Sequence, residues 1–517
     1  MNRLFGRDDR WAKASMFAAA FQGGCWQGTA NESKISRWET ATLRVPYQAI
    51  RRYEELLGLP GGLLSATVDN VHAYYCPDPD CPGTNGWSLP RNGPVPVGRV
   101  SELIDKASSS GLMTGHEWDE LTREISSEPN FFIAPSTAWT TLAERLLQEQ
   151  IIADRVAWLQ RFGALVRLLN HPVGQLPAIA ACVSLGADRM NQVGIEVICA
   201  LDVTGHPDAS QHVLAQLASP TSDKTFYGAL LACVRKVARG HFTPEQVRYL
   251  ASVVVSLLGD PARHDDARTL AASLLRQMPQ AVPTSEARKM RSWLTEDETV
   301  GQILTTGRLG TRPAAASRVR RIVSAASARM PREASWVYDE TLETLVDELL
   351  CSPVADVRLC AAFLIHATPY REPVASVLAT ELSSIAAVQT DLAICIMDAL
   401  RLLGGPAERP VVERLTLTPG IPVPVVASAA RNIGHLGGTS DDVYWLRAFN
   451  RQRDLLKRGA SPAGGAILRG LVYGLGMSRN DPLLTRIRDL DDMPWQAREA
   501  ASWWLSHPQR IRESAAR

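Results

Sequence analysis

The stretch Asn31-Glu-Ser-Lys-Ile-Ser-Arg-Trp-Glu39 combines short polar side chains with two basic ones. Asn31 is a favoured N-cap, so we expect a helix to begin directly after it. On such a helix Ile35 and Trp38 share one side, and the polar residues take the other. This division suits a helix that enters the major groove of DNA, because apolar residues hold it to its domain while polar ones reach bases and phosphates.

Each polar side chain here has a chemistry suited to one part of a duplex. Arg37 can donate two hydrogen bonds to guanine, and Glu32 can accept one from cytosine. Lys34 and Arg44 are better suited to phosphates, which position a protein without reading sequence. Residues 1–60 carry nine Lys or Arg and six Asp or Glu. This mildly basic balance favours contact with DNA.

The pattern S-x-I-S-R-W-E, then Pro46, then Tyr53-Glu-x-x-Leu-Gly-Leu59 resembles the third and fourth helices of Cro/C1-type (XRE family) helix-turn-helix domains. The resemblance implies that the third helix lies in the major groove and that the protein binds double-stranded DNA, commonly as a homodimer. Carried over by position, the groove-facing residues are Asn31, Glu32, Ser33, Lys34 and Arg37. The matching core residues are Ile35, Trp38, Tyr53 and Leu57.

The first half of the family's motif is matched less closely. Counting back from Ile35 places the glutamine of the family's second helix at Phe21, and Gln22 follows it directly. We therefore include Gln22 in the expected DNA-binding set. The expected second helix contains Gly23 and Gly24, and each glycine weakens a helix by about 1 kcal/mol relative to alanine. The alternative interpretation is a helical cap on the rest of the chain that no longer binds DNA.

Cys76 and Cys81 enclose four residues in a proline-rich stretch, and His72 lies four positions upstream. Thiolates and imidazoles are the common zinc ligands, and this spacing fits a turn that closes on a metal. No second cysteine pair follows, so we favour two loop cysteines without a metal and expect no cofactor.

Seven arginines and no acidic residue lie between Gly307 and Arg332. A helix there would bring Arg318, Arg321 and Arg329 near one face. That face is either a second strip for phosphates or a docking face for an acidic partner. The simplest interpretation is a solvated helix surface.

The surrounding chain divides into three regions: 1–66, 67–135 and 136–517. Residues 1–66 show short helical patterns, one over 10–21 and one over Tyr47–Leu57 that Gly58 ends. Residues 76–100 hold six prolines and four glycines, so 67–135 is expected to be a linker with one small helix. That helix follows Thr114 and Glu117, which have capping-box spacing.

From residue 136 onward helical patterns alternate with short breaks, and one short sequence motif recurs. Its leucine–glycine ends at Leu403, Leu436 and Leu475 are 33 and 39 residues apart. A unit of that length cannot bury its own apolar face, so neighbouring units must stack. This region resembles the HEAT-repeat family of α-solenoids, most clearly over 353–508. The alternative is a helical bundle without repeats.

The composition limits the remaining possibilities. A net charge of +1 argues against a chain that contacts nucleic acid along its whole length. No apolar run reaches the length of a membrane span, and the scattered cysteines suggest a reducing cytoplasm. Motifs for nucleotide, serine-hydrolase or zinc-protease chemistry are absent from the sequence, so we expect no enzyme.

The sequence thus predicts an all-α transcription regulator with an N-terminal helix-turn-helix and a HEAT-like α-solenoid. The solenoid is expected to dimerise or to receive a peptide, a metabolite or another protein. Two alternatives stay open. One is an interaction scaffold with a vestigial helix-turn-helix, and the other is a HEAT-like DNA glycosylase, which would need an aromatic-lined cleft with a catalytic carboxylate.

Overall fold

All regular elements of the computed structural model are helices, which confirms the all-α class for the described residues. The described residues are 1–6, 8–75, 97–260, 265–281, 297–310, 312–330, 339–386, 389–459 and 464–517. Extended pairing within them is limited to one isolated bridge, between Gly23 and Trp26. The predicted zinc ligands Cys76 and Cys81 lie outside the described residues.

Residues 1–75 form what we call the N-terminal unit. Its helices are α1 (Asn2–Phe5), the 3-10 helix η1 (Asp9–Ala12), α2 (Ala14–Phe21), α3 (Glu32–Glu39), α4 (Tyr47–Leu57) and α5 (Leu63–Tyr75). The bounds of α4 are those predicted, and Gly58 ends it at φ +62° in the left-handed region. The helix predicted over 10–21 is divided into η1 and α2. The predicted domain boundary after residue 66 falls inside α5.

Residues 97–310 form the first arm. Its helices are α6 (Val97–Ser108), α7 (Gly115–Ser127), α8 (Thr137–Ile151), α9 (Arg155–Leu169), α10 (Gln175–Ala187), α11 (Gly194–Cys199), η2 (Ala200–Val203), α12 (Pro207–Ala218), α13 (Asp223–Ala238), α14 (Pro244–Leu258), α15 (Asp265–Gln277), η3 (Pro279–Ala281) and α17 (Glu298–Thr306). Thr114 and Glu117 form the predicted capping box at the start of α7.

Residues 312–517 form the second arm. Its helices are α18 (Arg312–Ser327), α19 (Glu340–Cys351), α20 (Ala355–His366), α21 (Arg371–Ile385), α22 (Thr390–Leu403), α23 (Arg409–Leu417), α24 (Val423–Asn432), η4 (Ile433–His435), α25 (Asp442–Lys457), α26 (Gly464–Met477), α27 (Asp481–Asp489), α28 (Trp495–Ser506) and α29 (Gln509–Ala515).

The helices of the second arm pack in consecutive pairs, α19 with α20 through to α27 with α28, and the second members stack in a row. Small residues permit this stacking. A β-carbon built on Gly470 would lie 2.9 Å from the carbonyl oxygen of Ala427, and one on Gly474 would lie 2.7 Å from that of Ala430. Gly470 and Gly474 therefore lie where α26 approaches the backbone of α24.

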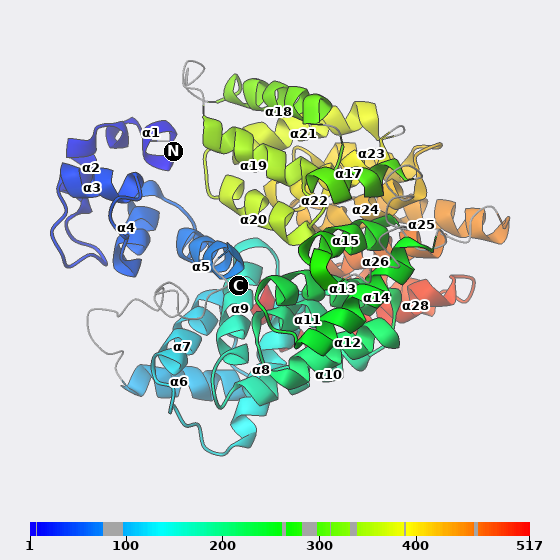
Figure 1. Cartoon of the computed structure of the whole chain (residues 1–517), viewed down its shortest axis with the longest axis horizontal. Coiled ribbons are helices and arrows are strands. Elements are labelled where there is room, and N and C mark those ends of the chain that lie inside the picture. Colours follow the sequence, from blue (N-terminus) through cyan, green and yellow to red (C-terminus); the bar gives the residue numbers. More distant parts are fainter. Residues whose placement is uncertain are drawn as a thin grey trace.

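The two arms contact each other along their inner helices (Figure 1). The ring of Trp158 on α9 stacks on that of Phe363 on α20, with centroids 5.9 Å apart. Arg401 on α22 donates to Glu196 on α11 at 3.2 Å. At the C-terminus Arg161 donates to the carbonyl oxygen of Ser514 at 2.6 Å. One hydrophobic core consequently runs through both arms.

None of the helices in the described ranges combines the length and apolar character that crossing a membrane requires. The described cysteines are free, and most of them are buried in helices as predicted.

Candidate nucleic-acid interface

The helix α3 begins where the sequence predicts. The Asn31 side chain accepts a hydrogen bond from the backbone N–H of Lys34 at 2.8 Å and so caps the helix. Ile35 and Trp38 are buried, with exposed fractions of 0% and 4%. The apolar side of α3 therefore faces the core of the N-terminal unit, as predicted.

An aromatic cluster holds α3 in place. Phe21 is its centre, with ring centroids 5.6 Å from Trp26, 5.6 Å from Trp38 and 5.3 Å from Tyr53. Phe17, one turn earlier in the same helix, adds a further contact to Tyr53, at 5.1 Å. Aromatic pairs at such distances contribute about 1 kcal/mol each beyond their burial. This small unit thus has a rigid core of its own under α3.

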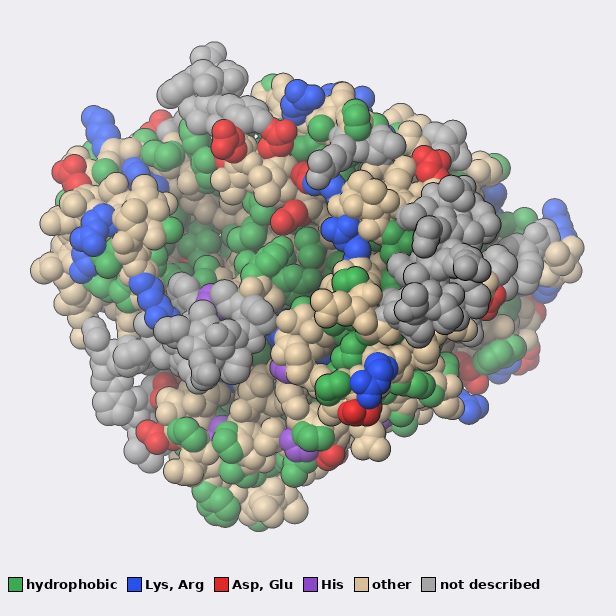
Figure 2. Space-filling view, in the orientation of Figure 1, with side chains coloured by type: hydrophobic (Ala, Val, Ile, Leu, Met, Phe, Trp, Pro, Cys, Tyr) green, Lys and Arg blue, Asp and Glu red, His purple; other side chains and the backbone are tan. Residues whose placement is uncertain are grey.

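The opposite side of α3 is exposed and polar. Glu32, Ser33, Ser36 and Arg37 are all exposed on it. The Arg37 side chain makes no hydrogen bond or ion pair with any residue that the structure describes. Figure 1 shows α2 and α3 at the outer edge of the N-terminal unit, with α5 between them and the arms. Lys and Arg side chains are exposed on this unit, at the left of Figure 2.

Two other predicted DNA-binding residues are engaged inside the unit. The Lys34 ammonium group donates to the carbonyl oxygen of Thr29 at 2.9 Å and lies 5.3 Å from the rings of both Trp26 and Trp38. The Gln22 side chain donates to the carbonyl oxygen of Ala30 at 3.0 Å. Both side chains therefore stabilise the loop that precedes α3.

That loop, residues 22–31, replaces the second helix predicted from the family's motif. α2 ends at Phe21, and Gly23 and Gly24 adopt φ +94° and +60°, which glycine reaches without a steric cost. Arg52 on α4 donates to the carbonyl oxygens of Ala20 and Phe21 at 2.6 and 3.2 Å. These bonds satisfy the carbonyl groups at the end of α2 and stabilise its termination.

Arg44 is exposed in the segment between α3 and α4. It lies near enough to His72 on α5 to lower the pKa of that imidazole, although burial is the larger cause of the shift. His72 is half-buried, and its two predicted zinc partners lie outside the described residues.

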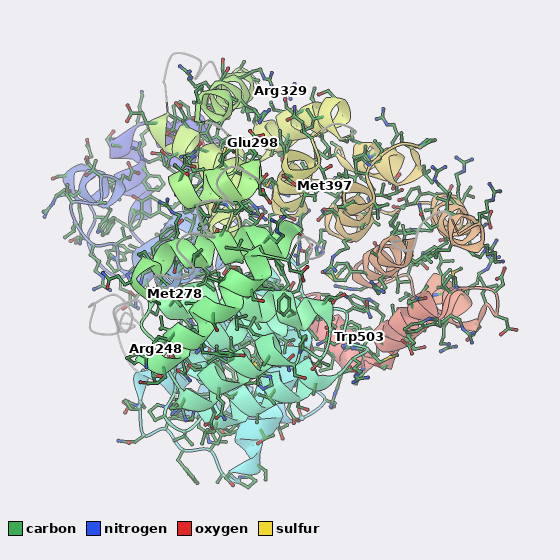
Figure 3. All side chains as sticks on the ribbon, turned by 45° about the vertical axis from the view of Figure 1, so that its right-hand side comes forward. Arg248, Met278, Glu298, Arg329, Met397 and Trp503 are labelled. Atoms are coloured by element: carbon green, nitrogen blue, oxygen red, sulfur yellow. The ribbon has the colours of Figure 1, made fainter. Side chains whose placement is uncertain are left out.

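The three arginines that were predicted to share one face lie on and just after α18, and they face α21. Arg318 donates to the side-chain oxygen of Gln389 at 3.0 Å, and Arg321 donates to Glu381 at 2.5 Å. Arg329 donates to the hydroxyl oxygen of Ser376 at 2.9 Å. Figure 3 shows Arg329 at the outer edge of the molecule. The three side chains share one face, and each has a partner within the second arm.

The structure also assembles a cluster that sequence spacing could not indicate. The ligand atoms of Cys199, Asp202 and Asp356 lie within 4.8 Å of one another. Arg235 donates to Asp202 at 3.0 Å, and its guanidinium group lies 4.7 Å from the ring of Tyr74 on α5. Burial raises the pKa of Asp356 to about 6. Arg235 and Asp202 form an ion pair within the first arm, Tyr74 of α5 packs on Arg235, and Asp356 on α20 of the second arm lies beside this pair.

No protein-family model matches the chain, and no curated protein matches it significantly.

Proposed function

We propose that this chain is a sequence-specific DNA-binding regulator of transcription and that α3 is the helix that enters the major groove. This proposal rests on the difference between the two sides of α3. Its apolar side packs on an aromatic core. Its other side exposes Glu32, Ser33 and Arg37 to solvent, and Arg37 has no partner among the described residues. Recognition helices read base edges with such side chains; Glu32 and Ser33 lie in the first turn of α3 and Arg37 in its last.

The predicted DNA-binding residues have different roles in this proposal. The guanidinium group of Arg37 makes no hydrogen bond to a described residue and can donate to guanine, and Glu32 can accept from cytosine. Asn31 and Ser33 are exposed at the start of α3, and the exposed Arg44 suits a phosphate. Lys34 and Gln22 act indirectly, because they hold the loop that precedes α3.

We further propose that the stacked helix pairs of the two arms are a HEAT-like α-solenoid in the cytoplasm that dimerises or receives an effector. A dimer would present two α3 helices to two half-sites. An effector that favours one arrangement of these helices would change the affinity for DNA.

The loop over residues 22–31 favours a second candidate function. In helix-turn-helix domains the helix before the recognition helix crosses the DNA backbone, and a loop stands in its place here. The second candidate is therefore an interaction scaffold whose N-terminal unit does not bind DNA.

Selection of retained sequences from a pool of random duplexes separates the two candidates. For the wild type we expect one enriched site, and for Arg37→Ala we expect its affinity to fall about 10- to 100-fold. Arg248→Ala is the matched control, because Arg248 is exposed on α14 at the edge of the first arm (Figure 3) and, among the described residues, pairs only with Glu245. Absence of enrichment at low salt, with correctly folded protein, supports the scaffold instead.

A further inference from the structure

The cluster of Cys199, Asp202 and Asp356 brings metal-binding side chains of both arms together. Cys199 is the last residue of α11, Asp202 follows it in η2, and Asp356 lies in the first turn of α20. Their three ligand atoms lie within 4.8 Å of one another, and the Cys199 thiol donates to Oδ2 of Asp202 at 3.7 Å. Two donors on one tetrahedral zinc ion are about 3.5 Å apart, so these separations suit a shared ion.

Two carboxylate oxygens of this cluster have no hydrogen-bond donor among the described residues. The Asp202 side chain is fully buried, and its Oδ1 atom makes no hydrogen bond. Oδ2 of Asp356 is also shielded from water and makes none. A buried carboxylate oxygen without a partner is unfavourable, because nothing replaces its lost hydration. A cation between the two carboxylates would supply that partner.

The neighbouring arginines balance only part of the negative charge. Arg235 donates to Oδ2 of Asp202 at 3.0 Å, and Arg239 donates to the backbone carbonyl oxygens of Asp202 and Ala73. Asp356 makes no hydrogen bond or ion pair with a described residue. Burial is the main cause that raises the pKa of Asp356 to about 6, and the charge of Asp202 adds to the rise although Arg235 opposes it. Asp356 therefore lacks a direct counter-charge.

The donor set indicates the class of cation. Magnesium and calcium prefer oxygen ligands alone, whereas zinc binds thiolate and carboxylate together. Burial, followed by the charges of Asp356 and Asp202, raises the pKa of Cys199 well above its usual value, so its thiol is neutral without a metal. A bound zinc ion would displace the thiol proton to water and take the sulfur as thiolate. Cys199 and Asp356 are half-buried, which leaves a side of the site open to a water ligand.

We propose that Cys199, Asp202 and Asp356 bind a zinc ion that joins the two arms. The thiolate, the two carboxylates, the Arg235 guanidinium and a divalent ion have charges that cancel. The site lies beside α5, which packs on α9 and α20 (Figure 1) and places Tyr74 on Arg235. This inference does not depend on DNA binding by α3.

The test titrates the full chain, first freed of metal by a chelator, with zinc chloride and separately with cobalt(II) chloride. Zinc should bind once per chain, release a proton and raise the unfolding temperature by several degrees, because it binds only the folded state. Cobalt(II) should produce a thiolate charge-transfer band in the near ultraviolet. Cys199→Ala should lose this band, and Asp356→Asn should bind zinc at least tenfold more weakly. Cys182→Ala, which removes a buried thiol on α10, is the matched control and should keep both properties.

A second measurement separates loss of the site from loss of the fold. Without metal, Asp356→Asn should unfold at the same temperature as the metal-free wild type or above it, because it removes a buried charge that has no partner. A lower temperature would contradict the described environment of Asp356. Absence of zinc binding, or a cobalt band that persists in Cys199→Ala, would overturn the proposal. Zinc that Cys199→Ala retains and Cys76→Ser/Cys81→Ser loses would also overturn it, because the ion would then lie at the other cysteines.

Discussion

At the scale of single residues, two basic side chains of one short helix have different environments. Arg37 is exposed and has no partner within the described part of the chain, whereas Lys34 folds back over two indole rings. The spacing of the motif predicts both as DNA contacts, because periodicity separates the apolar side of α3 from its polar side. It cannot indicate that a lysine at the edge of the polar side will reach a carbonyl group in the preceding loop.

Lys34→Ala should therefore destabilise α3, and Arg37→Ala should not. Removing the hydrogen bond to Thr29 and the contacts with Trp26 and Trp38 should cost about 1–2 kcal/mol of local stability. Hydrogen exchange of peptides covering residues 31–39 measures this difference. Equal protection in the two variants would contradict the described position of the lysine.

His366 provides a prediction about pH. Its imidazole is 8% exposed and bonded to the carbonyl oxygen of Leu402, and burial followed by the charge of Arg371 lowers its pKa from 6.5 to about 4. Between these values the unfolded chain binds a proton that the folded chain does not. The stability from this residue is thus complete above about pH 6.5 and decreases by about 2 kcal/mol by pH 5.

Chemical denaturation at pH 7.5 and pH 5 tests this sign. His366→Asn keeps a donor for Leu402 and cannot titrate, so its stability should fall about 2 kcal/mol less than that of the wild type over this interval. The same decrease in both proteins would show that His366 does not contribute.

At the scale of elements, local signals in the sequence predict helix ends well. Asn31 caps α3, Gly58 ends α4, and Thr114 with Glu117 caps α7, each as predicted, because these signals act through bonds within one turn. The predicted second helix of the motif was wrong. Glycines at 23 and 24 and the donors of Arg52, which is remote in sequence, favour a loop there.

Gly23→Ala distinguishes the loop from a helix. At φ +94° with no atom within 4 Å of the new β-carbon, alanine meets only backbone strain and should destabilise the unit by about 1 kcal/mol. In a helix the same substitution would stabilise by a similar amount. Hydrogen exchange in α2 and α3 reports the direction, and slower exchange in the variant would contradict the loop.

At the scale of the whole molecule, the two arms are closed against each other. Trp158 stacks on Phe162 within α9 and on Phe363 across the junction. The repeated sequence motif predicts that helix pairs stack on their neighbours. It contains no information about which remote pairs meet, since such contacts join residues about two hundred positions apart. The junction between the arms could not be predicted for that reason.

Trp158→Ala tests the importance of this junction. Losing a half-buried indole and both stacked contacts should lower the free energy of unfolding by about 2–4 kcal/mol, measured by chemical denaturation. Trp495→Ala is the matched control, because Trp495 is 63% exposed and its removal should cost less than about 0.5 kcal/mol. Similar losses in the two variants would indicate that the arms do not depend on this contact.

The central claim is that α3 binds DNA, and fluorescence anisotropy of a labelled duplex pool tests it most directly. At low salt we expect the wild type and Arg248→Glu to bind with similar affinity. Arg37→Glu should bind at least tenfold more weakly, because it places a negative charge against the duplex. Equal binding by all three proteins, or binding by none of them, would contradict the account.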